Sequence, residues 1–549
     1  MNVPKPAEAP ATKTPAKSSQ EVVLQHAANE LIFGVVGHVG SGTSEIARQL
    51  KSQLGLESLP GGPFDAEVLK ASGEIVAWLK ETGETAPDRE PGRLSCVEQL
   101  QDLGNRCRND QGDAAALARR LVQAVRRSRA EKQEEAADGD APVIPDGARR
   151  AWILDSLRHP SEVELLRHIY QDAFVLVGVV CDEDVRTERL QAKYDVDGSP
   201  QKIKTFMARD ADDTESLGQK VADSFHMSDF FVDNTENRTL KNGAPNEEWN
   251  VPDQLGRLIR LLTHSDVVRP TSHETAMHAA YGAQVRSACL SRQVGAALVS
   301  ADGQLLATGT NEVPRPGGGV YGQSDRAHDQ DDRCAFRRTA DHRFCSNTRE
   351  QNTIIDDLIQ QIEGSMQAGG GGELPAAAKL RLRSDLRKSR IGGLIEFSRA
   401  VHAEMDALLG AGRQGHKAVG AALYVTTFPC HYCARHIVAA GVDEVQYIEP
   451  YPKSLAIKLH DDAICVSENG RAINGNGGPR RVLFRPFTGV APRLYRRAFM
   501  KDRELKDRNT GGKQIGMPAW GTPWHLRRVS YVMLEAELSK KEVADGGAA

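Results

Sequence analysis

The chain has 549 residues, enough for two or more domains, and its 40% hydrophobic and 26% charged residues are typical of a globular protein. A net charge of −4 excludes a global basic field that would attract nucleic acid, but it leaves room for local basic patches. The nine scattered cysteines favour a reducing cytoplasm. No apolar run is long enough to cross a membrane, and the N-terminus lacks the apolar segment of a secretion signal, so we expect a cytoplasmic protein without membrane contact.

The N-terminal part begins with a predicted disordered tail, residues 1–22, which is rich in Pro, Ala, Lys and Ser. A buried strand is expected at 30–36, followed by a glycine-rich loop and a helix that begins near Glu45. This order is the context of a phosphate-binding P-loop, in which glycines let backbone N–H groups surround phosphate oxygens. The predicted nucleotide-binding residues are Gly37, Gly40, Ser41, Gly42, Thr43 and Ser44.

One position departs from the P-loop pattern, because Thr43 stands where a lysine normally holds the β- and γ-phosphates. We expect that a nucleotide with Mg²⁺ could still bind, but that phosphoryl transfer would be inefficient. The alternative is a glycine-rich turn that binds nothing.

More of this half is typical of an α/β domain. Further strands are expected at 151–156, 174–180 and 228–234, and their alternation with helices predicts a parallel sheet covered on both faces. Asp155 could help to hold magnesium. Arg186 and Arg189 and the acidic run 209–213 resemble parts of small-molecule kinases, although each alone is more often a solvated surface. We predict a P-loop kinase-like domain over 23–266, with a mobile insertion at 129–148.

The C-terminal part begins with a helix predicted over 271–290, which a capping box of Thr271 and Glu274 would start. A β-hairpin over 291–311 follows, with its turn at Asp302 and Gly303. Two more strands are expected at 421–427 and 445–449. We place a second domain at 267–535, with an insertion at 315–390 and a loose tail at 536–549.

The second domain carries the pattern H-x-E…P-C-x-x-C at His402, Glu404, Cys430 and Cys433, the signature of zinc-dependent hydrolytic deaminases of cytosine or adenine rings. A catalytic zinc takes three nitrogen or sulfur ligands from the protein and one water, so His402, Cys430 and Cys433 are the predicted ligands. The two cysteines lie one turn apart at a predicted helix start, which favours thiolates. Zinc lowers the pKa of its water, and Glu404 is the predicted proton carrier.

The alternative for this motif is a structural zinc site or a chance pair of cysteines. A structural site needs a fourth protein ligand, for which His431 or His436 is available. Neither histidine explains the upstream His402 and Glu404, so the catalytic interpretation is favoured.

The segments 291–296 and 308–311, together with the zinc motif, resemble a deoxycytidylate deaminase. With the kinase-like half and the segments 311–314, 449–454 and 487–493, residues 25–500 are similar to the two-domain anti-phage dCTP deaminases of bacteria. The resemblance implies a P-loop kinase-like parallel-sheet domain followed by a three-layer α/β/α cytidine deaminase-like domain.

The same resemblance implies an activity and partners. The activity is hydrolysis of dCTP and/or dCMP to dUTP or dUMP, which would deplete the DNA precursors of an infecting phage. The partners implied are deoxycytidine nucleotides, further copies of the chain in a homo-oligomer, and an inhibitory RNA or phage-derived trigger that controls a silent resting state.

Four substrate-binding residues are carried over from the family. Asn311 would contact the sugar or base, or else cap its own hairpin turn, and the Ala403 backbone would meet the ring edge. Tyr451 and Lys453 could close over the nucleotide, although Tyr451 could equally be core and Lys453 solvated.

The insertion between Asn311 and His402 carries a second group of metal-type side chains: His328, Cys334, His342 and Cys345. They could hold a second zinc, or they could belong to a mobile loop with free thiols. The basic stretch 379–390 could meet triphosphates or RNA, although a solvated helical face is favoured.

Three other functions remain open. A deaminase of single-stranded DNA or RNA shares the zinc chemistry, and the net charge counts against it. A bifunctional nucleotide kinase and deaminase is disfavoured by Thr43. A binding protein with an inactive deaminase fold is disfavoured, because all three ligand positions hold metal-binding residues and the catalytic position holds a glutamate, Glu404.

Overall fold

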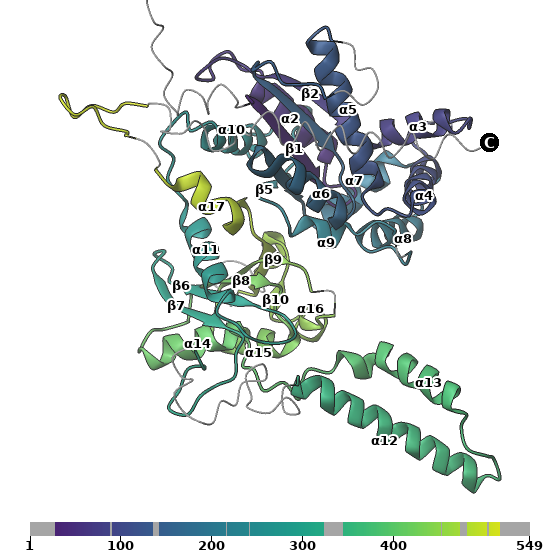
Figure 1. The fold of residues 1–549 in the computed structure, drawn as a ribbon. Helices are drawn as coiled ribbons and strands as arrows, with labels where there is room; N and C mark the ends of the chain where they lie inside the picture. The colour runs from purple at the N-terminus through teal and green to yellow at the C-terminus, as the bar shows by residue number, and fades with distance from the viewer. Residues whose placement is uncertain are drawn as a thin grey trace, which may run out of the picture.

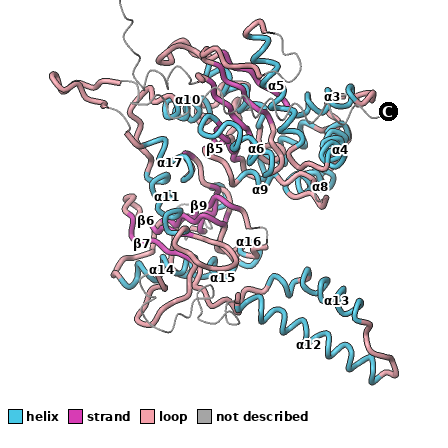
Figure 2. The backbone as a smooth tube through the Cα atoms, viewed as in Figure 1, coloured by secondary structure: helices cyan, strands magenta, loops and turns pink. Residues whose placement is uncertain are grey.

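The computed structural model describes residues 28–87, 90–135, 142–215, 217–240, 242–322, 344–451, 453–472, 480–501 and 504–515. These residues form two six-stranded sheets, both mainly parallel, with helices packed around each of them (Figures 1 and 2). The predicted α/β class is therefore confirmed. The predicted tails 1–22 and 536–549 lie outside the described residues. Among the described helices, none is both long and apolar enough to cross a membrane.

The first sheet has the strand order β12-β5-β4-β1-β3-β2. Its strands are β1 (Glu30–Val36), β2 (Asp65–Lys70), β3 (Arg150–Asp155), β4 (Phe174–Val180), β5 (Phe230–Asp233) and β12 (Gly489–Val490). All pairs are parallel except β12 with β5. The central strands are buried on both faces, which explains the continuous apolar runs at β1 and β4.

Helices connect these strands. They are α2 (Thr43–Leu54), α3 (Ala71–Glu81), α4 (Leu94–Gln111), α5 (Ala116–Lys132), α6 (Pro160–Tyr170), α7 (Glu183–Lys193), α8 (Pro200–Ala211), α9 (Val221–Phe225) and α10 (Val251–Leu262). The chain passes from the central strand β1 to β2 at one edge of the sheet. The following strands β3, β4 and β5 then lie progressively closer to the opposite edge. Right-handed crossovers therefore place α2 on one face and α5 and α6 on the other. Contacts of α2 with α10, and of α5 with α6, agree with this arrangement.

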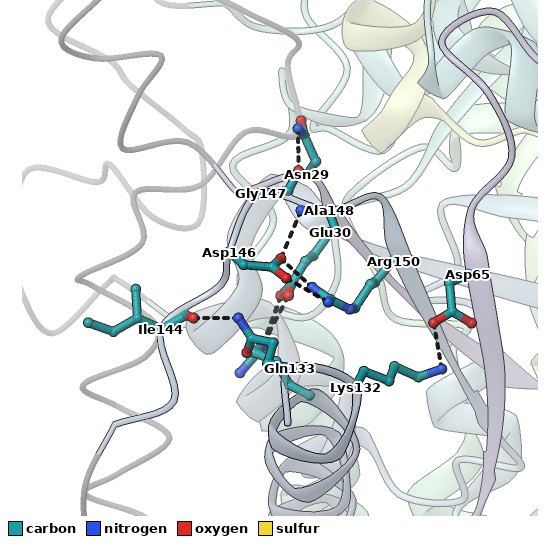
Figure 3. A network of polar contacts seen from close by, with 11 residues as sticks. Asn29, Glu30, Asp65, Lys132, Gln133, Ile144, Asp146, Gly147, Ala148 and Arg150 are labelled. Carbon is teal, nitrogen blue, oxygen red and sulfur yellow. Dashed lines mark hydrogen bonds and ion pairs between the residues drawn. The ribbon is translucent and has the colours of Figure 1, made fainter. Parts of the chain in front are cut away.

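The segment around the end of α5 differs from the prediction of a mobile insertion over 129–148. Helix α5 continues to Lys132, and only 136–141 lie outside the described residues here. Beyond that gap, Gln133 Nε2 donates to Ile144 O at 2.9 Å, and Asn29 Nδ2 donates to Gly147 O at 2.8 Å (Figure 3). These bonds fix the approach to β3, so the described residues of the predicted insertion, 129–135 and 142–148, are part of the fold.

The second sheet has the order β10-β11-β9-β8-β6-β7. Its strands are β6 (Gly295–Val299), β7 (Leu305–Thr310), β8 (Ala422–Thr427), β9 (Glu444–Glu449), β10 (Ile464–Cys465) and β11 (Val482–Pro486). Strand β6 is antiparallel to both neighbours, and the pairs from β8 to β10 are parallel.

Helices cover both faces of this sheet. Along β6, Ala296 and Leu298 pack in one core with α14 (Ala403–Arg413) and α15 (His431–Ala439), whereas Ala297 and Val299 pack in another with α11 (Ser272–Gln284). Successive strand residues point to opposite faces, so the domain has three layers. The capping box at α11 is present as predicted, but the helix ends six residues before 290.

The insertion forms a helical hairpin of α12 (Ser346–Ala368) and α13 (Ala376–Lys388). Figure 1 shows it projecting away from both sheets. Its basic helix is tied to its partner by ion pairs, for example Lys379 Nζ with Glu363 at 2.7 Å. The remaining described elements are α16 (Ala456–Leu459), α17 (Pro492–Phe499) and the short 3₁₀ turns Gln171–Ala173, Arg390–Gly393 and Glu468–Gly470.

The two halves share structure at their junction. Strand β12 pairs with β5, and Val490 and Leu494 belong to the core of the first sheet. The predicted boundary after 266 therefore does not hold for 489–499, which return to the first sheet because their apolar side chains complete its core. The Arg257 guanidinium joins the buried Glu274 carboxylate at 2.6 and 2.7 Å across the same junction.

Candidate active site

The residues of the zinc motif stand at the starts of two neighbouring helices. His402 is the N-cap of α14, Cys430 is the N-cap of α15, and Cys433 lies in the first turn of α15. Strand β8 ends at Thr427 and so delivers Cys430 to the carboxyl edge of the second sheet. Both helices are packed through small residues: Ala403, Ala407 and Ala434 are fully buried.

The three side chains converge. His402 Nδ1 lies 3.3 Å from both Cys430 Sγ and Cys433 Sγ, and the three ligand atoms lie within 4.8 Å of one another. Zinc–nitrogen and zinc–sulfur bonds of about 2.0–2.3 Å in a tetrahedron imply edges of about 3.5 Å, so the donor set fits zinc. Within the described part of the chain, no other three His, Cys, Asp or Glu side chains gather in this way, and neither His431 nor His436 joins the group.

The charge state of Cys430 suits a metal ligand. A hydrogen bond with Cys433, and then one with His402, lowers the pKa of the Cys430 thiol to about 4. The N-terminus of α15 favours the same thiolate, because the first N–H groups of a helix carry partial positive charge.

Glu404 lies in the first turn of α14, two residues after the predicted ligand His402, and only 4% of it is exposed. Burial, followed by the charge of Cys430, raises the pKa of its carboxyl to about 7. A carboxyl that exchanges its proton near neutral pH can act both as a base and as an acid.

The site opens into a cleft of about 540 Å³. The cleft is lined by Asp212, Cys289, Leu290, Ser291, Arg292, Val294, Asn311, Cys345, Ser346, Asn347, Ile395, Ser398, Arg399, Ala400, His402, Ala403, Glu404, Thr427, Phe428, Cys430, Tyr451 and Lys453. All four predicted substrate-binding residues are among them, so the structure brings them to one cavity with His402, Glu404 and Cys430.

Asn311 lines the cleft, but its amide is also engaged with the neighbouring backbone. Its Oδ1 accepts from Val294 N and its Nδ2 donates to Arg292 O, both at 2.6 Å. The side chain therefore holds the start of β6 in place beside the cleft. This role is close to the predicted alternative, in which Asn311 caps its own hairpin turn. The difference is that its bonds reach the residues just before the neighbouring strand β6.

Tyr451 and Lys453 follow β9 and border the cleft. The Tyr451 ring is half-buried, its centroid lies 6.0 Å from the Arg292 guanidinium, and Lys453 is exposed. Ser454 Oγ donates to Pro429 O at 2.7 Å, which ties this segment to the strand end that carries Cys430.

Several lining residues could not be identified from the sequence. The insertion returns to the cleft at both ends, through 345–347 at the start of α12 and through 395–400. Arg399 could have been suspected, since it lies three residues before His402. Asp212 comes from the end of α8 in the other half of the chain, and no sequence pattern links it to the zinc motif.

The predicted second metal group is only partly described. His328, Cys334 and His342 lie outside the described residues. Cys345 borders the cleft, with its Sγ 3.6 Å from Ser291 Oγ.

The glycine-rich loop lies at the first sheet and lines none of this cleft. Ser44 Oγ donates to Asp155 Oδ2 at 2.7 Å, and the Thr43 hydroxyl lies 3.1 Å from the Ser156 hydroxyl. The loop and the acidic end of β3 are therefore neighbours. Of the arginine pair, Arg186 approaches the loop, whereas Arg189 binds backbone carbonyls of 234–236.

Comparison with known proteins concerns the second half of the chain. Residues 270–449 match the family model of the cytidine and deoxycytidylate deaminase zinc-binding region. The deoxycytidylate deaminase of Enterobacteria phage T4 is 28% identical over 186 residues, which are 33% of this chain and 79% of that protein. The ComE operon protein 2 of Bacillus subtilis is 43% identical over 54 residues, which are 10% of this chain and only 29% of that protein.

A solved structure, the dCMP deaminase of the cyanophage S-TIM5, is 17% identical with a TM-score of 0.20, covering 40% of this chain and 99% of that one. The family match includes all three clustered ligands and Glu404. The second half of the chain thus contains a region, residues 270–449, that matches the cytidine and deoxycytidylate deaminase zinc-binding region.

Proposed function

We propose that this protein hydrolytically deaminates deoxycytidine nucleotides, dCTP and/or dCMP, to dUTP or dUMP in a zinc-dependent reaction. The observation that carries the proposal is the convergence of His402, Cys430 and Cys433, together with the buried Glu404, beside one cleft that His402, Glu404 and Cys430 line. The substrate class is supported by the T4 relative, which is a deoxycytidylate deaminase.

His402, Cys430 and Cys433 would hold the zinc, and zinc at such a site supplies a water nucleophile at neutral pH. Glu404 accepts a proton as the water oxygen bonds to C4 of the ring. It delivers this proton to the ring nitrogen N3. It then takes the second proton from the new hydroxyl on C4 and passes it to the exocyclic amino group, so that ammonia leaves as the C4–N bond breaks and the C4 carbonyl forms. The raised pKa of Glu404 suits both directions of this transfer.

Cations around the cleft favour a substrate with phosphates over a bare nucleoside. Arg292, Arg399 and Lys453 all border it, and arginine is well matched to phosphate oxygens. The number of phosphates that these three cations contact, one or three, would determine whether the enzyme prefers dCMP or dCTP.

We assign the first half a P-loop kinase-like fold with a sensing role. The parallel strand order, the glycine loop after the central strand β1 and the Ser44–Asp155 bond support the fold. Thr43 in place of lysine argues against efficient phosphoryl transfer. By resemblance, the protein acts in the cytoplasm as a homo-oligomer, and depletes DNA precursors in anti-phage defence under control of an inhibitory RNA or phage-derived trigger.

Ammonia release from dCTP, dCMP, deoxycytidine and single-stranded DNA, measured side by side with zinc-loaded protein, tests the substrate class. We expect turnover of dCTP or dCMP and none of the DNA. Turnover of the polynucleotide alone would establish the rival function instead.

Replacing Glu404 by Gln tests the mechanism. We expect Glu404→Gln to retain its zinc, because Glu404 is not a ligand, and to lose turnover by at least about a hundredfold. Metal analysis and ammonia release on the same sample measure both. The matched control is Glu350→Gln on the exposed surface of α12, which should change neither. Substantial residual turnover in Glu404→Gln would contradict the assigned role.

A further inference from the structure

The glycine-rich loop of the first half has the form of an anion site. Gly37–Ser44 connects β1 to α2, and Gly40 and Gly42 have φ angles of +83° and +90°. Glycines with positive φ angles occur in anion-binding nests, although here the Ser41 N–H donates to His38 O at 3.0 Å.

An internal carboxylate already lies on this loop. Asp210, near the end of α8, accepts a hydrogen bond from Val39 N at 2.8 Å through Oδ2. Its other oxygen pairs with the Arg158 guanidinium, which also donates to Gly37 O at 3.3 Å. Asp210 is completely buried, and its carboxyl group occupies the Val39 amide, one of the N–H groups of the loop.

Two polar groups at the loop, the Ser41 hydroxyl and the Arg186 Nε, do not bind Asp210. The Ser41 hydroxyl is 1% exposed, and it has no hydrogen-bond partner among the described residues. It lies inside the loop, 2.6 Å from where a side-chain carbon on Gly37 would be. The Arg186 Nε is likewise buried and unpartnered there, although Nη1 lies 3.5 Å from Val39 O.

The surroundings are electropositive. Burial, followed by the charges of Arg186 and Arg158, lowers the pKa of His38 to about 3, so this histidine is neutral. The Arg158 guanidinium pairs with Asp210, whereas the Arg186 guanidinium reaches Val39 O through Nη1 and lies 4.0 Å from the Glu183 carboxylate through Nη2. A phosphate group, with more acceptor oxygens than a carboxylate, could use the Val39 amide, the Ser41 hydroxyl and both arginines.

The segment that carries Asp210 also reaches the other half of the chain. Helix α8 ends at Ala211, and Asp212 lines the cleft of the zinc motif. Asp210 and Asp212 are two residues apart, so displacement of one moves the other.

We propose that the loop Gly37–Ser44 binds a phosphate group of a nucleotide in exchange for the Asp210 carboxylate, and that Asp212 transmits this exchange to the deaminase cleft. The second step rests on the proposed deaminase function, whereas the first does not. Asp210 acts as a built-in competitor, which keeps the loop closed until a phosphate ligand is present.

Binding is tested by calorimetric titration of full-length, zinc-loaded protein with MgATP and with inorganic tripolyphosphate. We expect Asp210→Asn to bind both at least fivefold more tightly than the wild type, because the amide competes less well for Arg158. Arg186→Gln should bind at least fivefold more weakly. Asp212→Asn, a change of the same charge two residues away, should bind as the wild type does.

Hydrogen exchange provides a readout that needs no variant. Tripolyphosphate should speed amide exchange at residues 209–213 of the wild type as Asp210 leaves the loop. Unchanged exchange, or equal affinity in the wild type, Asp210→Asn and Arg186→Gln, would overturn the proposal.

The transmission step has its own measurement. MgATP should shift the KM for dCTP or dCMP at least twofold in the wild type, and Arg186→Gln should abolish the shift. An unchanged KM despite binding would overturn the role of Asp212. Binding without turnover of any substrate would contradict the proposed deaminase function and leave the phosphate site established.

Discussion

Position relative to a helix start sets the chemistry of the zinc-motif side chains. Cys430 precedes α15, where the helix dipole and the neighbouring Cys433 favour its thiolate, whereas Glu404 is buried and holds its proton to near neutral pH. One residue is thus prepared to bind a cation and the other to carry a proton. Both roles follow from local surroundings, not from residue type alone.

Removal of one ligand should abolish metal binding. Cys433 is 1% exposed and has no substitute nearby among the described residues. We expect Cys433→Ser to lose zinc affinity by more than the roughly 10–100-fold that follows loss of an outer-sphere partner. Chelator competition followed by metal analysis measures this change. The control Cys465→Ser, a buried cysteine in β10, should keep its zinc, and stable zinc in Cys433→Ser would refute the assignment.

At this scale the sequence was informative wherever residue type and spacing are dictated by chemistry. The clustering of His402, Cys430 and Cys433 could be predicted because the motif combines metal-ligating residue types at a spacing that suits one metal ion. Asn311 could be placed near the site, but its bonds to Arg292 O and Val294 N depend on how β7 pairs with β6. Such bonds have no signature in the residue order.

Strands and helices in the deaminase domain approach one another closely at two glycines. A side-chain carbon on Gly309 of β7 would lie 2.0 Å from Ala403 O and 2.4 Å from Ala407 N of α14. A carbon on Gly295 of β6 would lie 1.9 Å from Ala280 O of α11. Only glycine permits these distances, so both layers depend on it.

The contact at Gly309 should therefore tolerate no side chain. We expect Gly309→Ala to push α14 away from β7, to lower the free energy of unfolding by about 1–3 kcal/mol, and to weaken zinc binding through His402. Urea unfolding and zinc titration measure the two effects. The control is Gly282→Ala in α11, where an added side-chain carbon would meet no neighbouring atom within 4 Å. Its free energy of unfolding should be unchanged or higher by up to about 1 kcal/mol. Equal stability of the two variants would contradict this account.

Elements were predictable where burial makes them apolar, and not where they lie at an edge. The buried strands β1, β4 and β8 match the apolar runs, but β2 is a partly exposed edge strand whose polar sequence hid it. The early end of α11 has another cause. Ala288 N donates to Glu312, a tertiary bond that competes with continued helix.

The molecule as a whole has two sheets that are not independent. An apolar cluster joins Phe225 and Phe231 of the first half to Met277, Tyr424 and Phe487 of the second. With β12 added to the first sheet, the chain crosses the junction twice. Sequence patterns describe neighbours along the chain, so they could not show that 489–499 returns to the first sheet or that Asp212 reaches the cleft.

This junction should make the two halves unfold together. Phe487 is 1% exposed, and its ring packs edge-on against Phe231 with centroids 6.2 Å apart. Phe487 N also donates to Tyr447 O at 2.8 Å, which anchors the contact beside β9. Loss of a buried phenylalanine costs about 3–5 kcal/mol, and here the cost falls on the contact between the halves.

We therefore expect one calorimetric transition for the wild type and two for Phe487→Ala, because the weakened junction no longer forces both sheets to melt together. The ratio of calorimetric to van't Hoff enthalpy should rise above its wild-type value. Phe397→Ala, at a ring that is 39% exposed, removes the same side chain away from the junction and should leave a single transition. A single transition in Phe487→Ala would mean that β12 and the Arg257–Glu274 pair suffice to couple the halves.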